Sequence, residues 1–469
     1  MKAFSRRAFL AAAIVISLVG NGHSRAAAPA VRAAEARGYV GSQKCRACHP
    51  DKYSEWKGTL HSRMVQEFNP GSTDANFEIA PFNKGEVRFV IGGMDEYDFV
   101  GRRDLKLIPF YWDMGKREWV KQDVYNWIGE CAQCHTTGWE AKSRTWSEIA
   151  IACEACHGPG RAHVASGGKT KVIRSVGSDE MCGRCHNGTE KEPRQGVRIA
   201  VNHGKSLADL RADREARGEC LRCHSQDYRE APSESSPTLE TAKYGITCVT
   251  CHDPHKRTGH PGQLKEETNK LCTDCHTAVK VEVGSGARVR QPQKEMIEGS
   301  MGIGLENGIV NSVGIRLEAV PNSAIKKKVT CSDCHMKYDV PRSAGTMPNH
   351  LFKAGTPSGS YRNHFGETVP YNSCTGCHAS MSQERFDAYQ KEVRDRVTAI
   401  QKKLDLAKSY QAQARPADRG LYEHAFTILS FVRADGSFGI HNDRYTKDLL
   451  RAADVYITDF LNGVPDYAK

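Results

Sequence analysis

Apolar residues recur every three or four positions near the C-terminal end of the chain, which is the spacing of an amphipathic helix. The pattern begins after Ser382, a residue that can cap a helix, and predicts one long helix that ends before Pro416. Two further helices are predicted over about residues 421–432 and 443–461. Residues 381–469 are therefore predicted to form a C-terminal helical bundle.

A different pattern lies between about residues 80 and 125, where β-branched and aromatic residues are interrupted by glycines. Three such segments cover residues 87–93, 97–101 and 105–112. This composition is typical of short antiparallel strands and predicts a small β insertion near the N-terminus.

The first residues of the chain combine a basic start with an apolar run from Ala11 to Val19 and small residues around Ala28. This order predicts a cleaved export signal over residues 1–30, because the apolar run is too short to span a bilayer stably. The Arg6-Arg7 pair also resembles a twin-arginine signal, although we favour the general export route. The expected location is the periplasm, the cell surface or the outer membrane, with no transmembrane segment in the mature chain.

The overall composition excludes two broad classes of protein. The 469 residues are 26% charged and 39% hydrophobic, which fits neither a polytopic membrane protein nor a disordered chain. The informative number is the count of 18 cysteines.

Every cysteine lies in a Cys-x-x-Cys pair, and a histidine follows each pair directly. Cys-x-x-Cys-His is the attachment motif of c-type haem, in which two thiols bond covalently to the porphyrin and the histidine ligates the iron. The sequence therefore predicts nine c-type haems (heme c, containing iron), each with a proximal histidine. The nine motifs are Cys45/Cys48/His49, Cys131/Cys134/His135, Cys153/Cys156/His157, Cys182/Cys185/His186, Cys220/Cys223/His224, Cys248/Cys251/His252, Cys272/Cys275/His276, Cys331/Cys334/His335 and Cys374/Cys377/His378.

Disulfide scaffolds and structural zinc sites also use paired cysteines. Neither requires a histidine directly after every pair, and histidine makes up only 19 of the 469 residues. Nine coincidences in nine pairs favour haem over both alternatives.

All nine motifs lie between residues 45 and 378, so few residues separate one haem from the next. The haems themselves are therefore predicted to form the core, with short helices and loops around them. The predicted fold is mainly α with little regular structure. It comprises a nonahaem cytochrome c domain over residues 31–380, which contains the β insertion, and the C-terminal helical bundle.

The formal net charge of +11 does not indicate a nucleic-acid partner. Removal of the signal leaves about +7. The two propionates of each haem then take the reduced protein to about -11. The basic side chains are expected to pair mostly with propionates.

Ten histidines remain outside the motifs, and His23 is lost with the signal. The nine left match the nine sixth coordination positions in number, which predicts mostly bis-histidine iron, an arrangement that favours electron transfer. His424 is equally well explained as a core histidine of the bundle, and Met64 or Met347 are alternative ligands. The candidate distal ligands are His61, His163, His203, His255, His260, His350, His364, His424 and His441.

These motifs resemble those of the multihaem c-type cytochromes that include pentahaem nitrite reductase, octahaem hydroxylamine oxidoreductase and octahaem tetrathionate reductase. Residues 41–62 are similar to the opening haem segment of several such proteins, which implies that His61 is a distal ligand. Residues 248–255 are similar to a paired-haem pattern whose trailing histidine serves a neighbouring haem. Residues 439–442 are similar to the Gly-x-His-Asn turn of nitrite reductase, whose histidine ligates a haem from the C-terminal bundle.

The chain departs from nitrite reductase at the positions that carry catalysis. That family usually holds its catalytic haem through Cys-x-x-Cys-Lys, whereas every motif here ends in histidine. It also has a catalytic histidine shortly before a motif similar to that at Cys331, and residues 291–329 contain no histidine. Tyr228 follows its motif much as a catalytic tyrosine does in the family, but one tyrosine does not establish catalysis. No catalytic residue is predicted.

The sequence predicts an exported nonahaem cytochrome that transfers electrons along a chain of closely packed, mostly bis-histidine haems. Expected partners are other cytochromes, a quinol-oxidising complex or an extracellular acceptor, and a homodimer through the C-terminal helices is a further alternative. The alternative function is a reductase or oxidoreductase of nitrite, hydroxylamine or a sulfur oxyanion with one five-coordinate haem.

Overall fold

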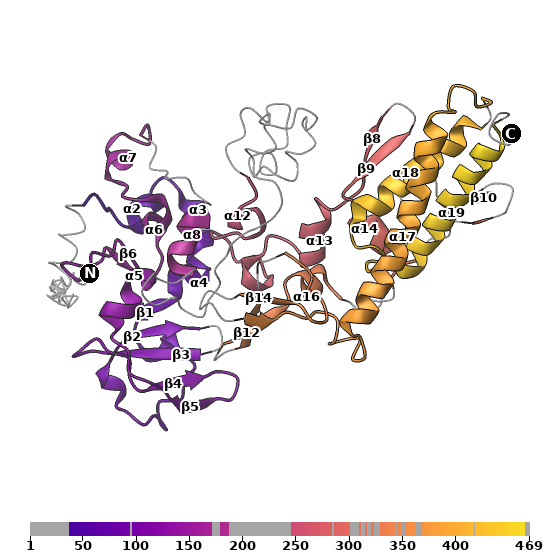
Figure 1. Ribbon diagram of the computed structural model, residues 1–469. Coiled ribbons are helices and arrows are strands. Elements are labelled where there is room, and N and C mark those ends of the chain that lie inside the picture. The colour runs from indigo at the N-terminus through magenta and orange to yellow at the C-terminus, as the bar shows by residue number, and fades with distance from the viewer. Residues whose placement is uncertain are drawn as a thin grey trace, which may run out of the picture.

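The computed structural model describes residues 37–93, 96–170, 179–186, 245–283, 286–300, 309–310, 315–316, 320–322, 329–342, 345–348, 350, 352–362, 368–416 and 418–464. The predicted export signal, the motif Cys220/Cys223/His224, Tyr228, His203 and His364 lie outside these ranges. The described chain is elongated, with short helices and a β-sheet at one end and three long helices at the other (Figure 1).

Short helices and loops make up most of the described chain before residue 380, as the sequence predicts for a polypeptide wrapped around haem groups. Single-turn helices are too short to be stable alone in water, so their positions depend on tertiary contacts. The short helices are α2 (Ser42–Arg46), α3 (Pro50–Lys57), α4 (Leu60–Arg63), η1 (Pro70–Ser72), η2 (Lys84–Glu86), the π-helical turn η3 (Trp127–Cys131), α5 (Ala132–His135), α6 (Cys153–His157), α7 (Arg161–Ala165), α8 (Asp179–His186), α12 (Cys248–Cys251), η4 (Pro261–Gln263), α13 (Thr268–Thr273), α14 (Gln293–Glu298) and α16 (Cys331–His335).

The predicted β insertion is a five-stranded antiparallel sheet whose strands follow the order of the sequence. Side chains on both faces are buried, with Phe89 and Trp127 in one apolar cluster and Phe99 and Trp112 in another. The third predicted segment forms a strand only from Phe110 onward. The strands are β1 (Val65–Glu67), β2 (Val87–Gly92), β3 (Glu96–Gly101), β4 (Phe110–Asp113) and β5 (Glu118–Lys121).

Five further pairs of short strands lie in the other described parts of the chain. They are β6 (Thr136–Thr137) with β7 (Glu148–Ile149), β8 (Val279–Glu282) with β9 (Ala287–Arg290), β10 (Ile309–Val310) with β11 (Ile315–Arg316), β12 (Tyr338–Arg342) with β13 (Gly345–Pro348), and β14 (Ser360–Arg362) with β15 (Thr368–Pro370).

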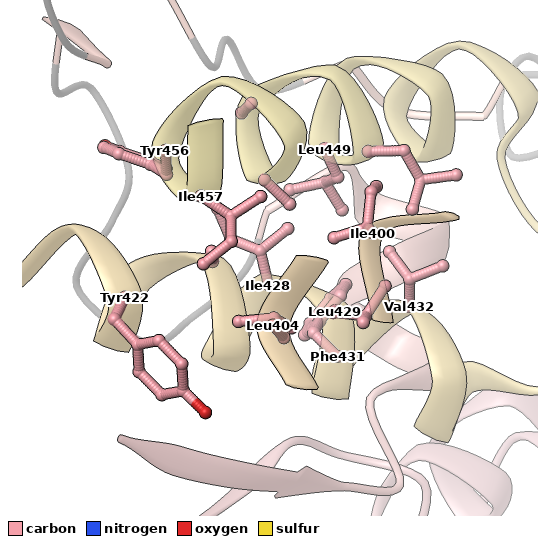
Figure 2. Close-up of a cluster of buried hydrophobic side chains, with 14 of the residues drawn as sticks. Ile400, Leu404, Tyr422, Ile428, Leu429, Phe431, Val432, Leu449, Tyr456 and Ile457 are labelled. Atoms are coloured by element: carbon pink, nitrogen blue, oxygen red, sulfur yellow. The ribbon is translucent and has the colours of Figure 1, made fainter. Parts of the chain in front are cut away.

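The predicted C-terminal bundle consists of α17 (Gln383–Lys408), α18 (Arg419–Asp435) and α19 (Asp443–Asn462). Figure 2 shows the apolar side chains that the three helices direct toward one another, among them Ile400, Ile428 and Leu449. Strand β9 and helix α14 contribute Val289 and Met296 to the same buried cluster, which attaches the bundle to the motif-bearing region. None of the helices in the described ranges combines the length and the apolar character needed to cross a bilayer.

Candidate haem-binding sites

The attachment motifs adopt the single helical turn that covalent haem binding requires. The backbone N–H of His49 donates to the carbonyl oxygen of Cys45 at 2.9 Å, and the same bond joins His378 to Cys374 at 2.8 Å. This turn brings both thiols and the imidazole of one motif together, which suits attachment to one porphyrin.

Five motif histidines each face one of the candidate distal histidines. An iron bound to one nitrogen of each ring needs about 2 Å on either side, and each ring centre lies about 1 Å behind its nitrogen, so a separation near 6 Å fits a metal between the rings. The pairs, with the distance between ring centres, are His49 and His163 (6.2 Å), His186 and His61 (6.3 Å), His157 and His255 (6.0 Å), His252 and His350 (6.2 Å), and His335 and His441 (6.1 Å).

Several of these imidazoles are held in the neutral form, which is the form that ligates a metal. Burial, with a smaller contribution from the nearby His186, lowers the pKa of His61 to about 4. Burial also lowers the pKa of His157, His255 and His335.

The second ring nitrogen of several paired histidines has an oxygen partner. Nδ1 of His163 lies 2.7 Å from the carbonyl oxygen of Thr170, and Nδ1 of His252 lies 2.7 Å from that of Gly262. Because a carbonyl only accepts, Nδ1 carries the proton in each case and Nε2 keeps a lone pair for a metal.

The motif histidine His276 has a different partner from the five paired ones. Its backbone N–H donates to the carbonyl oxygen of Cys272 at 2.8 Å, so the attachment turn is present. Its Nδ1 lies 3.1 Å from the side-chain oxygen of Gln293 in α14, which leaves Nε2 for a metal. The arrangement fits a proximal ligand, and the distal ligand opposite His276 stays a prediction.

The fifth and the last motif differ in whether the structure describes them. The fifth motif, with the thiols of Cys220 and Cys223 and the imidazole of His224, lies outside the described residues, so its haem stays a prediction. In the last motif the side chain of Cys377 is exposed, unlike the half-buried Cys374. The backbone N–H of Cys377 donates to the carbonyl oxygen of Cys374 at 3.1 Å, so the turn forms although the described chain does not enclose that thiol. Cys48 and Cys185 are exposed as well, and covalent haem attachment at each motif stays a prediction.

The remaining described candidates do not face a described motif histidine. His424 lies in α18, where its ring centre is 5.1 Å from that of Tyr456, and its buried Nδ1 has no hydrogen-bond partner among the described residues. His424 as a distal ligand and His424 as a core histidine of the bundle therefore both stay predictions. His260 lies at the start of η4, and Met64 packs against the apolar cluster beside the sheet.

Motif helices at the N-terminal end of the molecule lie against one another. Helix α2 packs on α6, and the nearby thiol of Cys153, together with burial, raises the pKa of the Cys45 thiol. Helix α5 packs on α8, where the thiol of Cys134 donates to the carbonyl oxygen of Arg184 at 3.7 Å and lies near the thiol of Cys185. Figure 1 shows α2, α5, α6 and α8 gathered beside the sheet.

The later motifs form a second group. Helix α13 packs on α16, and the nearby thiol of Cys331, together with burial, raises the pKa of the Cys272 thiol. The hydroxyl of Ser373 donates to the carbonyl oxygen of Cys334 at 2.6 Å, so the motif that follows Ser373 lies beside α16. Cys251, the last residue of α12, lies near Cys272. Helix α12 is therefore at the other end of this group.

Contacts between motifs give no support to the disulfide and zinc alternatives. Cys45, Cys153, Cys272 and Cys331 are thiols in these contacts rather than disulfide partners. Within the described ranges, no three side chains of histidine, cysteine, aspartate or glutamate gather as a metal site.

Two carboxylates that the sequence does not single out contact the motif region. Glu154, inside the motif at Cys153, accepts hydrogen bonds from the backbone N–H groups of Val40 and Gly41. Asp435 lies 2.6 Å from Nδ1 of His441. No sequence pattern predicts either contact, because each one depends on how the folded chain brings the two partners together.

Sequence profiles of three cytochrome groups match different, partly overlapping parts of the chain. The profile described as doubled CXXCH motif matches residues 241–281, and that of cytochrome c7 and related cytochrome c matches residues 139–225. The profile of cytochrome c554 and c-prime matches residues 44–84 and 114–158.

Two solved structures share the fold over most of the chain. The outer cell wall cytochrome OcwA is 26% identical with a TM-score of 0.70, and the match covers 90% of this chain and 100% of OcwA. The undecaheme cytochrome from the S-layer of Carboxydothermus ferrireducens is 30% identical with a TM-score of 0.70, and the match covers 90% of this chain and 70% of that protein.

Curated relatives are longer than the region they share with this chain. The dissimilatory sulfite reductase MccA of Wolinella succinogenes is 23% identical over an alignment of 374 positions, and the match covers 66% of this chain and 49% of MccA. The chain spans 42%, 49% and 62% of the lengths of three curated relatives.

Proposed function

Because the chain belongs to the multihaem c-type cytochromes, which bind haem through Cys-x-x-Cys-His motifs and transfer electrons, we propose that it carries electrons through nine c-type haems of which most are bis-histidine ligated. The observation that carries this proposal is the set of five imidazole pairs, each a motif histidine opposite a histidine from elsewhere in the chain. Bis-histidine iron has no position open to substrate, which suits a carrier.

The contacts between motifs support one order of haems in space. In the N-terminal group, the haem at Cys131 would neighbour that at Cys182, which would neighbour that at Cys153. The ring pair of His157 and His255 links this group to the haem at Cys248, because His255 follows that motif by three residues. The haems at Cys248, Cys272, Cys331 and Cys374 would then follow in sequence order.

The protein's place outside the cytoplasmic membrane is also part of the proposal. It is supported by the N-terminal export signal and by relatives that are named for the outer cell wall and the S-layer. In that compartment the chain would exchange electrons with other cytochromes, a quinol-oxidising complex or an extracellular acceptor.

The count and ligation are tested on purified protein. A pyridine haemochrome assay is expected to give nine haems per chain, and EPR of the oxidised protein is expected to give mostly low-spin ferric signals. Far fewer haems, or mostly high-spin iron, would overturn the proposal.

The order of haems is tested by removing one at a time. Replacing Cys272 and Cys275 with alanine removes an interior haem, so reduction of the others should split into two phases in a stopped-flow experiment. The matched control replaces Cys45 and Cys48, whose haem lies at the edge of the N-terminal group, and should lose one haem without splitting the kinetics. Identical kinetics in the two variants would contradict the order.

Similarity to MccA favours a second candidate, reduction of a sulfur oxyanion at one five-coordinate haem. This function predicts a high-spin ferric signal that shifts when sulfite, nitrite, hydroxylamine or cyanide is added. A spectrum that none of these ligands changes would exclude it.

A further inference from the structure

A buried carboxylate lies behind one of the paired imidazoles. The side chain of Asp435, the last residue of α18, is 1% exposed, and its Oδ1 lies 2.6 Å from Nδ1 of His441. The backbone N–H of Ser437 donates to Oδ2 at 3.2 Å, and the hydroxyl of the same serine donates to Oδ2 as well. Because a carboxylate only accepts, Nδ1 of His441 carries a proton and Nε2 has the free lone pair.

The turn that carries His441 is fixed on several sides. The backbone N–H of His441 donates to the hydroxyl of Ser437 at 3.1 Å, and the carbonyl oxygen of His441 accepts from the side chain of Asn322. Gly439 has a φ of +94°, and a Cβ there would lie 2.3 Å from the hydroxyl oxygen of Tyr389, so only glycine fits. The carboxylate and the imidazole therefore meet across a rigid loop.

This arrangement differs chemically from those of other paired histidines. Nδ1 of His163 and Nδ1 of His252 each face a neutral backbone carbonyl oxygen at 2.7 Å, whereas His441 faces a buried charge. A carboxylate that accepts the Nδ1 proton makes the imidazole a more basic ligand, and a more basic ligand favours ferric over ferrous iron.

We propose that Asp435 is a positioning residue that lowers the reduction potential of the haem at Cys331 and Cys334 by holding His441 as a strongly donating distal ligand. This inference rests on the proposed function, in which His335 and His441 ligate that haem. In the proposed order of haems it lies between those at Cys272 and Cys374. A lowered potential there makes electron transfer onto that haem less favourable than it would be without the carboxylate.

The test replaces Asp435 with asparagine in the haem-loaded protein. Asparagine keeps the shape and an acceptor oxygen but removes the charge. The reduction equilibrium of one haem should shift about tenfold toward the ferrous form, which is about 59 mV for a one-electron couple. Its low-spin EPR signal should shift too, while the haem count stays unchanged. That signal is assigned as the one missing from a variant without Cys331 and Cys334.

Two further variants keep the test decisive. Asp443→Asn removes a charge two residues from His441, on a side chain that is 56% exposed and bonded to Tyr389 and Lys447 rather than to the imidazole, so it should leave the potential unchanged. Ser437→Ala removes one donor to the Asp435 carboxylate and should shift the same haem by a smaller amount, and it decides the question if Asp435→Asn does not fold.

Unchanged potentials in fully loaded Asp435→Asn protein, or an equal shift in Asp443→Asn, would overturn this inference alone. Failure of the proposed ligation would look different. In that case His441→Ala would leave the spin state of every haem unchanged.

Discussion

Glu154 joins two attachment motifs through backbone hydrogen bonds. Its side chain lies inside the motif at Cys153 and is 3% exposed, and its oxygens accept from the backbone N–H groups of Val40 at 3.0 Å, Gly41 at 2.8 Å and Gly160 at 2.7 Å. Hydrogen bonds to a charged acceptor are stronger than neutral ones. This one side chain therefore fixes the segment that enters the motif at Cys45 relative to α6.

Replacing Glu154 with glutamine should lower the free energy of unfolding by about 2–3 kcal/mol, because an NH2 group then faces backbone donors in a buried site. The measurement is denaturant unfolding followed by haem absorbance. Glu140→Gln is the matched control, since that side chain is 37% exposed and 3.9 Å from Arg37, and its effect should stay below about 1 kcal/mol. Equal effects would contradict the role of Glu154.

Removing one distal ligand should change the spin state of one haem. His255→Ala is expected to convert the haem at Cys153 from low-spin to high-spin, because the ring 6.0 Å from His157 is lost. His255→Met supplies another axial ligand and should stay low-spin with a raised potential. A low-spin spectrum in His255→Ala would rule out this pairing. The measurement is EPR of the oxidised protein.

At this scale the sequence predicts residue types better than it predicts partners. The histidine count identifies His61 and His441 as candidate ligands, but their partners His186 and His335 lie across loops whose path no local pattern determines. The sequence does not predict the contact of Asp435 with His441 for a related reason. An aspartate at the end of a helix carries no motif, and its importance depends on the turn that returns the chain to it.

At the scale of elements, local signals predict the C-terminal helices and fail for isolated short strands. Helix α17 begins at Gln383, one residue after the predicted cap, and Ser382 accepts from the backbone N–H of Arg385. Periodicity and capping are local properties, which is why the bundle is predictable. Strand β1 has three residues and forms through its pairing with β2, so no local sequence pattern within it predicts a strand.

A core substitution tests whether the bundle supports the neighbouring haem. Leu449 of α19 is fully buried, so Leu449→Ala should destabilise the bundle by about 2–5 kcal/mol. His441 lies two residues before the start of α19, so one haem should turn high-spin when the bundle unfolds, at a lower denaturant concentration than in the unmodified protein. Leu406→Ala, at a position 43% exposed, should leave that concentration nearly unchanged. If the high-spin signal appears at the same denaturant concentration in Leu449→Ala as in the unmodified protein, the bundle does not support the ligation of that haem.

At the scale of the whole molecule, the order of motifs in space differs from their order in the sequence. The motif at Cys131 lies beside that at Cys182, while the motif at Cys45 lies beside that at Cys153. Motif spacing predicts close packing but not neighbours, because helices of one or two turns can pack in many arrangements. Export and the homodimer through the C-terminal helices stay predictions.

Acid should destabilise the molecule as a whole, because buried histidines of both groups titrate in the same direction. The pKa of His61 is about 4 in the folded chain against about 6.5 for an unperturbed imidazole, and burial also lowers the pKa of His157, His255 and His335. The unfolded chain therefore binds more protons between these values, so stability is highest above about pH 6.5 and falls as the pH drops toward 4.

Bound iron competes with the proton for the same nitrogen, so the stability of the haem-loaded protein should also fall as the pH drops. The denaturant midpoint at pH 5 should lie below that at pH 7.5, with a matching rise of high-spin absorbance at the lower pH. His61→Gln should reduce the slope, because each histidine contributes at most about 1.4 kcal/mol per pH unit in this range. A midpoint that stays constant from pH 7.5 to pH 5 would show that protonation of the buried imidazoles is not coupled to unfolding.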